Sequence, residues 1–137
     1  MILDDGDDTL AEALARLEGH PVVVNQWASW CPPCEREFPL FQQAAETFAA
    51  DVAFLGLNAQ DGRDAAADFL GELPVPYPHV FDPDASQAAS IGIGRSWPST
   101  VFIDERGEVV DAFQGEYVSQ EQLDDQIRHA LLDGKGG

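Results

Sequence analysis

Apolar residues recur along this chain with two spacings, one typical of buried strands and one typical of amphipathic helices. Continuous apolar runs predict buried strands over 22–27 and 52–58. Apolar positions three and four residues apart predict helices over 9–17, 34–50, 63–73, 85–91 and 120–132. A short strand is expected at 79–81, and a hairpin at 99–104 and 108–113 that turns at 105–107.

The long helix over 34–50 has an apolar stripe formed by Phe38, Phe41, Ala45 and Phe48. Pro39 lies inside this helix and should kink it. In the last helix, Leu123, Ile127, Ala130 and Leu131 are expected to face inward.

The order of these elements predicts an α/β fold with a central mixed sheet and helices on both faces. Strands that alternate with helices form parallel sheets, and the late hairpin adds antiparallel strands. We predict one domain over 9–133, preceded by an acidic lead-in at 1–8 and followed by a flexible tail at 134–137. A chain of 137 residues buries roughly two-thirds of its unfolded surface, so it needs no disulfide framework to fold.

The charge excludes some classes of partner. The chain has 25 acidic residues against 7 basic ones, a net charge of −18. Such a surface repels nucleic acid and anionic membranes. The sequence has no apolar stretch of 18 residues and no signal-peptide pattern.

The two cysteines of the chain, Cys31 and Cys34, lie between a predicted strand and a predicted helix. A disulfide that closes so short a loop stabilises a fold by only about 2 kcal/mol, so the pair is better explained by reactivity than by stability. At a helix N-terminus the thiol pKa of Cys31 is expected to be lowered, which favours the thiolate that attacks disulfides. Cys34, one turn into the helix, is placed to resolve the mixed disulfide.

The residues around the cysteines are expected to limit that effect. Pro32 and Pro33 fit the first helical turn and have no N–H, which leaves the Cys34 and Glu35 amides as donors toward the Cys31 sulfur. Glu35 and Glu37 repel a nearby thiolate. A moderately lowered pKa favours a reductant over a strong oxidant. A zinc site is the alternative for two cysteines at this spacing, but the three histidines have no paired spacing, so no metal is expected.

Residues 22–39, with the sequence VVVNQWASWCPPCEREFP, resemble thioredoxin-fold proteins, and within them the TlpA/ResA group of extracytoplasmic thiol–disulfide oxidoreductases. The segment WPSTVFID at 97–104 resembles the cis-proline loop of this family, and Gly107 resembles its hairpin glycine. The likeness covers roughly residues 10–132 and implies a thioredoxin fold.

The resemblance implies roles for the site residues. Cys31 is the expected nucleophile and Cys34 the resolving thiol. Pro98 is expected to be cis and to pack against the pair, and its neighbour's backbone is expected to bind a substrate chain as an added strand. Trp30, Pro32, Pro33 and Trp97 are the expected substrate contacts, whereas Trp27 is expected to pack beneath the site.

Two positions depart from the family pattern. Asn25 stands where cytosolic thioredoxins have a buried aspartate that accepts a proton. We therefore predict Asp61, at the carboxyl-terminal edge of the sheet, as the group that helps to deprotonate Cys34; a simple turn at Asp61-Gly62 is the alternative. Trp97 replaces a smaller residue before the proline, either to shield the disulfide, to bind substrate or only to pack.

The resulting expectation is an enzyme that reduces protein disulfides outside the cytoplasm, with cytochrome c maturation or general thiol maintenance as its context. It implies a monomer, no dissociable cofactor, a membrane or soluble thiol electron donor, and a signal or anchor missing from this chain; a cytoplasmic location is the alternative. A DsbA- or PDI-type oxidase or isomerase is the first rival, and a non-catalytic thioredoxin-like binding module is the rival of another class. A peroxiredoxin-like peroxidase is disfavoured, because Ala28 occupies the third position before Cys31.

Overall fold

A six-stranded mixed sheet forms the centre of the computed structural model, which describes residues 2–3 and 9–132. Its strands are β1 (Ile2–Leu3), β2 (Val22–Trp27), β3 (Ala53–Ala59), β4 (His79–Asp82), β5 (Ser99–Ile103) and β6 (Val109–Gln114). They lie in the order β1-β4-β3-β2-β5-β6, and the first four are parallel to one another. The hairpin β5–β6 adds antiparallel strands beside β2. The predicted parallel core with a terminal hairpin is confirmed, and β1 is an additional strand.

Each helix expected from the apolar spacing is present, with ends that differ by at most a few residues. The helices are α1 (Leu10–Arg16), α2 (Pro32–Thr47), α3 (Arg63–Glu72), α4 (Ser86–Ser90) and α5 (Gln120–Ile127), and a π-helical turn, Arg128–Leu132, continues α5. Thr9 and Ser119 cap α1 and α5, because their side chains accept hydrogen bonds from the first free amides of each helix. None of the described helices is long and apolar enough to cross a membrane. The acidic cluster at 4–8 and the glycine-rich tail lie outside the described residues.

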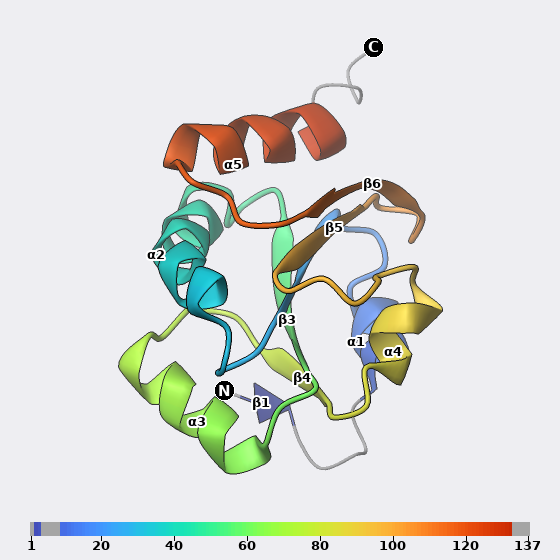
Figure 1. Cartoon of the computed structure of the whole chain (residues 1–137). Helices are drawn as coiled ribbons and strands as arrows, with labels where there is room; N and C mark the ends of the chain where they lie inside the picture. The colour runs from blue at the N-terminus through green and yellow to red at the C-terminus, as the bar shows by residue number, and fades with distance from the viewer. Residues whose placement is uncertain (1, 4–8, 133–137) are drawn as a thin grey trace.

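The helices cover both faces of the sheet (Figure 1). One face is packed by α2 and α5, whose core side chains include Phe41, Ala44, Leu123 and Ile127. The other is packed by α1 and α4 against valines and leucines of the central strands. The stripe predicted for α2 is buried, and Pro39 lies inside the helix as expected.

A third cluster joins α2, α3 and the end of β2. Its buried members are Trp27, Ala28, Cys31, Cys34, Phe38 and Ala66. Gly56 allows the His79 ring to lie against β3, since a Cβ at this position would collide with the ring. The packing therefore places both cysteines at the carboxyl end of β2, on the edge of the core.

Candidate redox site

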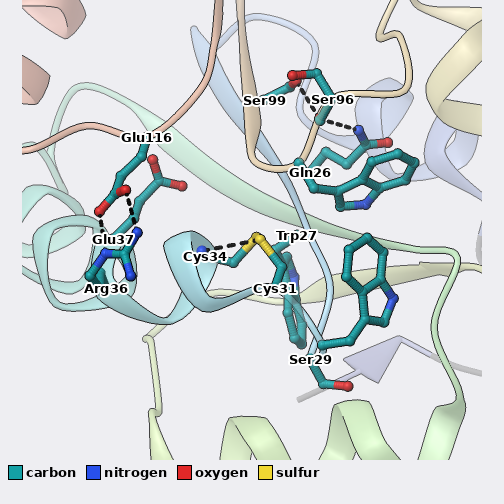
Figure 2. The surroundings of a disulfide bond; sticks show 12 residues. Gln26, Trp27, Ser29, Cys31, Cys34, Arg36, Glu37, Ser96, Ser99 and Glu116 are labelled. Atoms are coloured by element: carbon teal, nitrogen blue, oxygen red, sulfur yellow. Dashed lines mark hydrogen bonds and ion pairs between the residues drawn. A yellow bond between two sulfur atoms is a disulfide. The ribbon is translucent and has the colours of Figure 1, made fainter.

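Cys31 and Cys34 form a disulfide at the N-terminus of α2 (Figure 2). Cys31 is the N-cap residue, with φ −108° and ψ 102°, and its Cα lies 5.3 Å from that of Cys34. The Cys34 amide donates a hydrogen bond of 3.2 Å to the Cys31 Sγ. The position predicted for Cys31, at the N-cap of the long helix, is confirmed.

One backbone N–H is directed at the Cys31 sulfur, whereas the sequence left two available. The Glu35 amide donates instead to the Cys31 carbonyl oxygen, at 3.2 Å. Pro32 and Pro33 occupy the first two helical positions and have no N–H to offer. Cys31 is 3% exposed and Cys34 is fully buried, so Cys31 is the more accessible of the two cysteines.

The Trp97–Pro98 peptide bond is cis, as the sequence resemblance implied. Pro98 is buried, and its carbonyl oxygen accepts a hydrogen bond of 2.9 Å from the Gly115 amide. The Trp97 indole N–H donates to the Ala59 carbonyl oxygen at 3.2 Å, and the ring packs against the cluster that contains the cysteines. The loop before β5 is thus tied to both β3 and the end of β6.

The three tryptophans of the site differ in exposure. Trp27 is fully buried, and its indole N–H donates to Nδ1 of His79 at 3.0 Å. Trp30 is 54% exposed, donates to the Gln60 carbonyl oxygen at 2.7 Å, and its ring centroid lies 5.6 Å from that of Trp97. The predicted burial of Trp27 and exposure of Trp30 are confirmed. Trp30 and Trp97 form an aromatic surface beside Cys31.

Asp61 lies where β3 leads into α3, and hydrogen bonds engage both of its carboxylate oxygens. They accept from the Ser29 amide (2.6 Å) and hydroxyl (2.8 Å), from Asn58 Nδ2 (3.0 Å) and from the Gly62 amide (2.8 Å). Partial burial opposes ionisation, but the hydrogen bonds together outweigh it and lower the pKa of Asp61. Asp61 therefore joins this turn to the residues just before Cys31.

Glu37, expected from the sequence only as a charge near the helix N-terminus, is a buried acid. Its side chain is fully buried, with Oε1 accepting from Asn25 Nδ2 and Oε2 accepting from the Tyr117 amide, both at 3.0 Å. Burial raises the pKa of Glu37 to about 7, although both hydrogen bonds act against the rise. Helical spacing places it one turn beyond Cys34 on the same face, a signal present in the sequence.

The segment that follows β6 is bound to the first turns of α2 by an ion pair and a hydrogen bond. Arg36 forms a bidentate ion pair with Glu116, with Nε to Oε2 and Nη2 to Oε1 both at 2.9 Å. Together with the bond from the Tyr117 amide to Glu37, this fixes residues 116–117 against the helix that carries Cys34. Within the described part of the chain, no three His, Cys, Asp or Glu side chains gather to hold a metal ion.

Comparison with known proteins shows the family to which this chain belongs. A family model described as Redoxin matches residues 3–127. The thiol:disulfide interchange protein DsbE of Pseudomonas fluorescens biotype C is 36% identical over 111 residues, which cover 80% of this chain and 59% of that protein. The thiol-disulfide oxidoreductase ResA of Halalkalibacterium halodurans is 32% identical, with 87% of this chain and 67% of that protein covered. The chain thus spans about three-fifths to two-thirds of the length of these relatives.

Solved structures agree with these sequence matches. The structure of MTB dsbF in its mixed oxidized and reduced forms has a TM-score of 0.75 and 32% identity, and 84% of each chain is covered. The sheet flanked by helices on both faces is therefore the thioredoxin fold that the sequence indicated. At its site, two sulfurs can exchange two electrons with a disulfide or dithiol that reaches Cys31.

Proposed function

Because this chain belongs to the Redoxin family, we propose that it is a thiol–disulfide oxidoreductase that reduces disulfides in other proteins. The observation that carries the proposal is the Cys31–Cys34 disulfide at the N-terminus of α2, next to the Trp97–cis-Pro98 loop. The two sulfurs hold the exchanged electrons, so the cycle requires no dissociable cofactor.

The proposed cycle begins with both cysteines reduced. The Cys31 thiolate attacks one sulfur of a substrate disulfide, whose S–S bond breaks as the other sulfur leaves as a thiolate. Cys34, once deprotonated, attacks the Cys31 sulfur of the mixed disulfide and releases the second substrate thiolate. Two electrons pass to the substrate, and the protein is left with its own disulfide. A dithiol donor, in the membrane or in solution, then reverses the same chemistry.

The second step needs a group that takes the proton of Cys34, and two carboxylates are candidates. The sequence indicated Asp61, whose lowered pKa makes it a weak base. Glu37 has a pKa raised to about 7 by burial and lies one helical turn from Cys34. A base is most effective when its pKa lies near the operating pH, so Glu37 is the better-suited acceptor.

Substrate recognition is assigned to the surface around Cys31. Trp30 and Trp97 offer an apolar platform, and Pro32 and Pro33, the first two residues of α2, are assigned as further substrate contacts. An extended substrate segment would lie along the backbone of the loop that contains Pro98. The resemblance to the TlpA/ResA group supports an extracytoplasmic location and substrates such as an apocytochrome disulfide. An open site of this kind favours a monomer.

A single-turnover reaction tests the proposal. Reduced protein mixed with excess insulin should release two insulin thiols per molecule, and Cys31→Ala should release none. Cys34→Ala should stop at a mixed disulfide through Cys31, visible by mass spectrometry. Absence of thiol release from the wild-type protein would contradict the reductase. If a variant with both Cys31→Ala and Cys34→Ala then bound a protein partner with unchanged affinity, the chain would be a binding module.

A further inference from the structure

A buried amide, Gln26, lies in an apolar layer of the sheet on the side away from α2. Side chains alternate along a strand, so Gln26 shares its face of β2 with Val22 and Val24. Those valines belong to the cluster packed by α1 and α4. Gln26 itself is 0% exposed. A leucine at this position would match its neighbours, so the amide needs an explanation.

The side chain of Gln26 binds the loop that leads to the cis-proline. Its Nε2 donates to the carbonyl oxygens of Gly94 (3.2 Å) and Ser96 (3.0 Å), which uses both hydrogens of the amide. These two acceptors fix the orientation of the group, because the reverse orientation would place three oxygens together. Its Oε1 has no partner among the described residues, and an unsatisfied buried acceptor costs stability.

The carbonyl oxygen of Ser96, a half-buried residue, accepts two side-chain hydrogen bonds (Figure 2). Its carbonyl oxygen accepts from Gln26 and also from the Ser99 hydroxyl, at 2.6 Å. The next residue is Trp97, whose indole is tied to Ala59 on β3. The backbone just before Trp97 is therefore held by Gln26 of β2 and by Ser99, the first residue of β5.

We propose that Gln26 is a positioning residue for substrate recognition: its amide holds the Gly94 and Ser96 carbonyls so that Trp97 and Pro98 present a fixed surface to a polypeptide substrate. The inference rests on the proposed reductase function. Gln26 lies on the opposite face of the sheet from the disulfide cluster, so its loss should weaken polypeptide binding and leave the chemistry of Cys31 and Cys34 intact.

Steady-state reduction of insulin, with dithiothreitol as donor, is one arm of the test. The other arm is the reaction of pre-reduced protein, freed of dithiothreitol, with 5,5′-dithiobis(2-nitrobenzoate), a small disulfide that needs no strand recognition. Gln26→Leu should raise the KM for insulin at least fivefold, with kcat and the rate with the small disulfide both within twofold of wild type. Gln26→Met is the second variant, for use if the Gln26→Leu protein does not fold. Gln120→Leu is the matched control, because it also removes a hydrogen bond from a glutamine side chain to a backbone carbonyl. That bond joins Gln120 Nε2 to the Leu40 oxygen at 3.0 Å, away from this loop.

Two results would overturn the inference. One is an insulin KM within twofold of wild type in both Gln26 variants, and the other is an equal loss with insulin and with the small disulfide. Ser99→Ala should also raise the KM for insulin. The effects of Ser99→Ala and Gln26→Leu on this KM should be non-additive, because both side chains donate to the Ser96 carbonyl oxygen. If the wild-type protein reduces no insulin, the proposed function fails before this inference is reached.

Discussion

Glu37 carries a fully buried carboxyl group that sits between a strand amide and a loop amide. Its pKa of about 7, against an ordinary value of 4.5, means that the folded protein holds this proton more tightly than the unfolded chain does. The stability due to that proton is complete below about pH 4.5 and is lost as the pH rises through about 7.

Glu37→Gln tests this residue, because glutamine keeps the shape and cannot titrate. The free energy of unfolding of the wild type, relative to the variant, should fall by roughly 3 kcal/mol between about pH 4 and pH 8. Urea unfolding at both pH values measures it. A difference that stays constant with pH would contradict the buried, titrating carboxyl.

Gly56 tests the close approach of a side chain to the backbone. Gly56→Ala should destabilise the fold by about 2–4 kcal/mol, because the added Cβ collides with the buried His79 ring, which Trp27 holds by a hydrogen bond. Gly71→Ala, in an exposed turn of α3 with open space around it, should instead stabilise by about 0.5–1 kcal/mol. Thermal unfolding measures the stability of both variants. Equal changes in Tm for Gly56→Ala and Gly71→Ala would contradict the close packing of His79 against β3.

At the scale of elements, Asp61 links the β3–α3 turn to the residues before α2. Asp61→Asn should cost about 1–3 kcal/mol at neutral pH, because an amide cannot accept all four hydrogen bonds. Since the pKa of Asp61 is lowered, the stability it gives is present above its ordinary value of 3.8 and is lost as the pH falls further. The deficit of the variant should therefore shrink in acid unfolding curves, and a deficit unchanged at low pH would contradict the role of the charge.

Glu37→Gln and Asp61→Asn also test which carboxylate accepts the proton of Cys34. In single-turnover reactions, Glu37→Gln should slow the resolution of the mixed disulfide more than Asp61→Asn does, if Glu37 accepts the proton of Cys34. The reverse order would favour the assignment made from the sequence.

The elements themselves could be predicted from the sequence because their signals are local. The apolar runs of β2 and β3, and the three- and four-residue spacing in α2, specify a strand or helix without knowledge of the rest. The cysteine pair was equally clear, since its spacing and its place before a helix lie within a few residues. The exposure of Trp30 and the burial of Trp27 were expected from the resemblance of residues 22–39 to thioredoxin-fold proteins.

The roles of Glu37 and Gln26 could not be predicted in this way, because they depend on distant partners. Glu37 is bound by Asn25 and by Tyr117, 80 residues away in sequence, and Gln26 contacts a loop 68 to 70 residues away. A glutamate near a helix N-terminus ordinarily faces water and suits the helix dipole. The short strand β1, with only two residues, likewise has no periodicity to detect.

At the scale of the whole molecule, the net charge of −18 means that the acidic side chains repel one another, and salt should screen this repulsion. Raising NaCl from about 10 mM to 0.5 M should raise the Tm by a few degrees, as measured by calorimetry. Asp68→Asn with Glu72→Gln, two exposed positions of α3, changes the charge from −18 to −16 and should reduce the response. A Tm independent of salt would show that the charges are too dispersed to matter.

If the Cys31–Cys34 pair is a reducing couple, its reduction potential must lie on the reducing side of the scale. The pair would be equilibrated with defined glutathione or dithiothreitol buffers and the oxidised fraction measured by Trp fluorescence or thiol trapping. One backbone N–H on the Cys31 sulfur and nearby acids predict a value below roughly −230 mV, on the thioredoxin side of the scale. A value above about −180 mV would contradict the reductase and indicate an oxidase or isomerase.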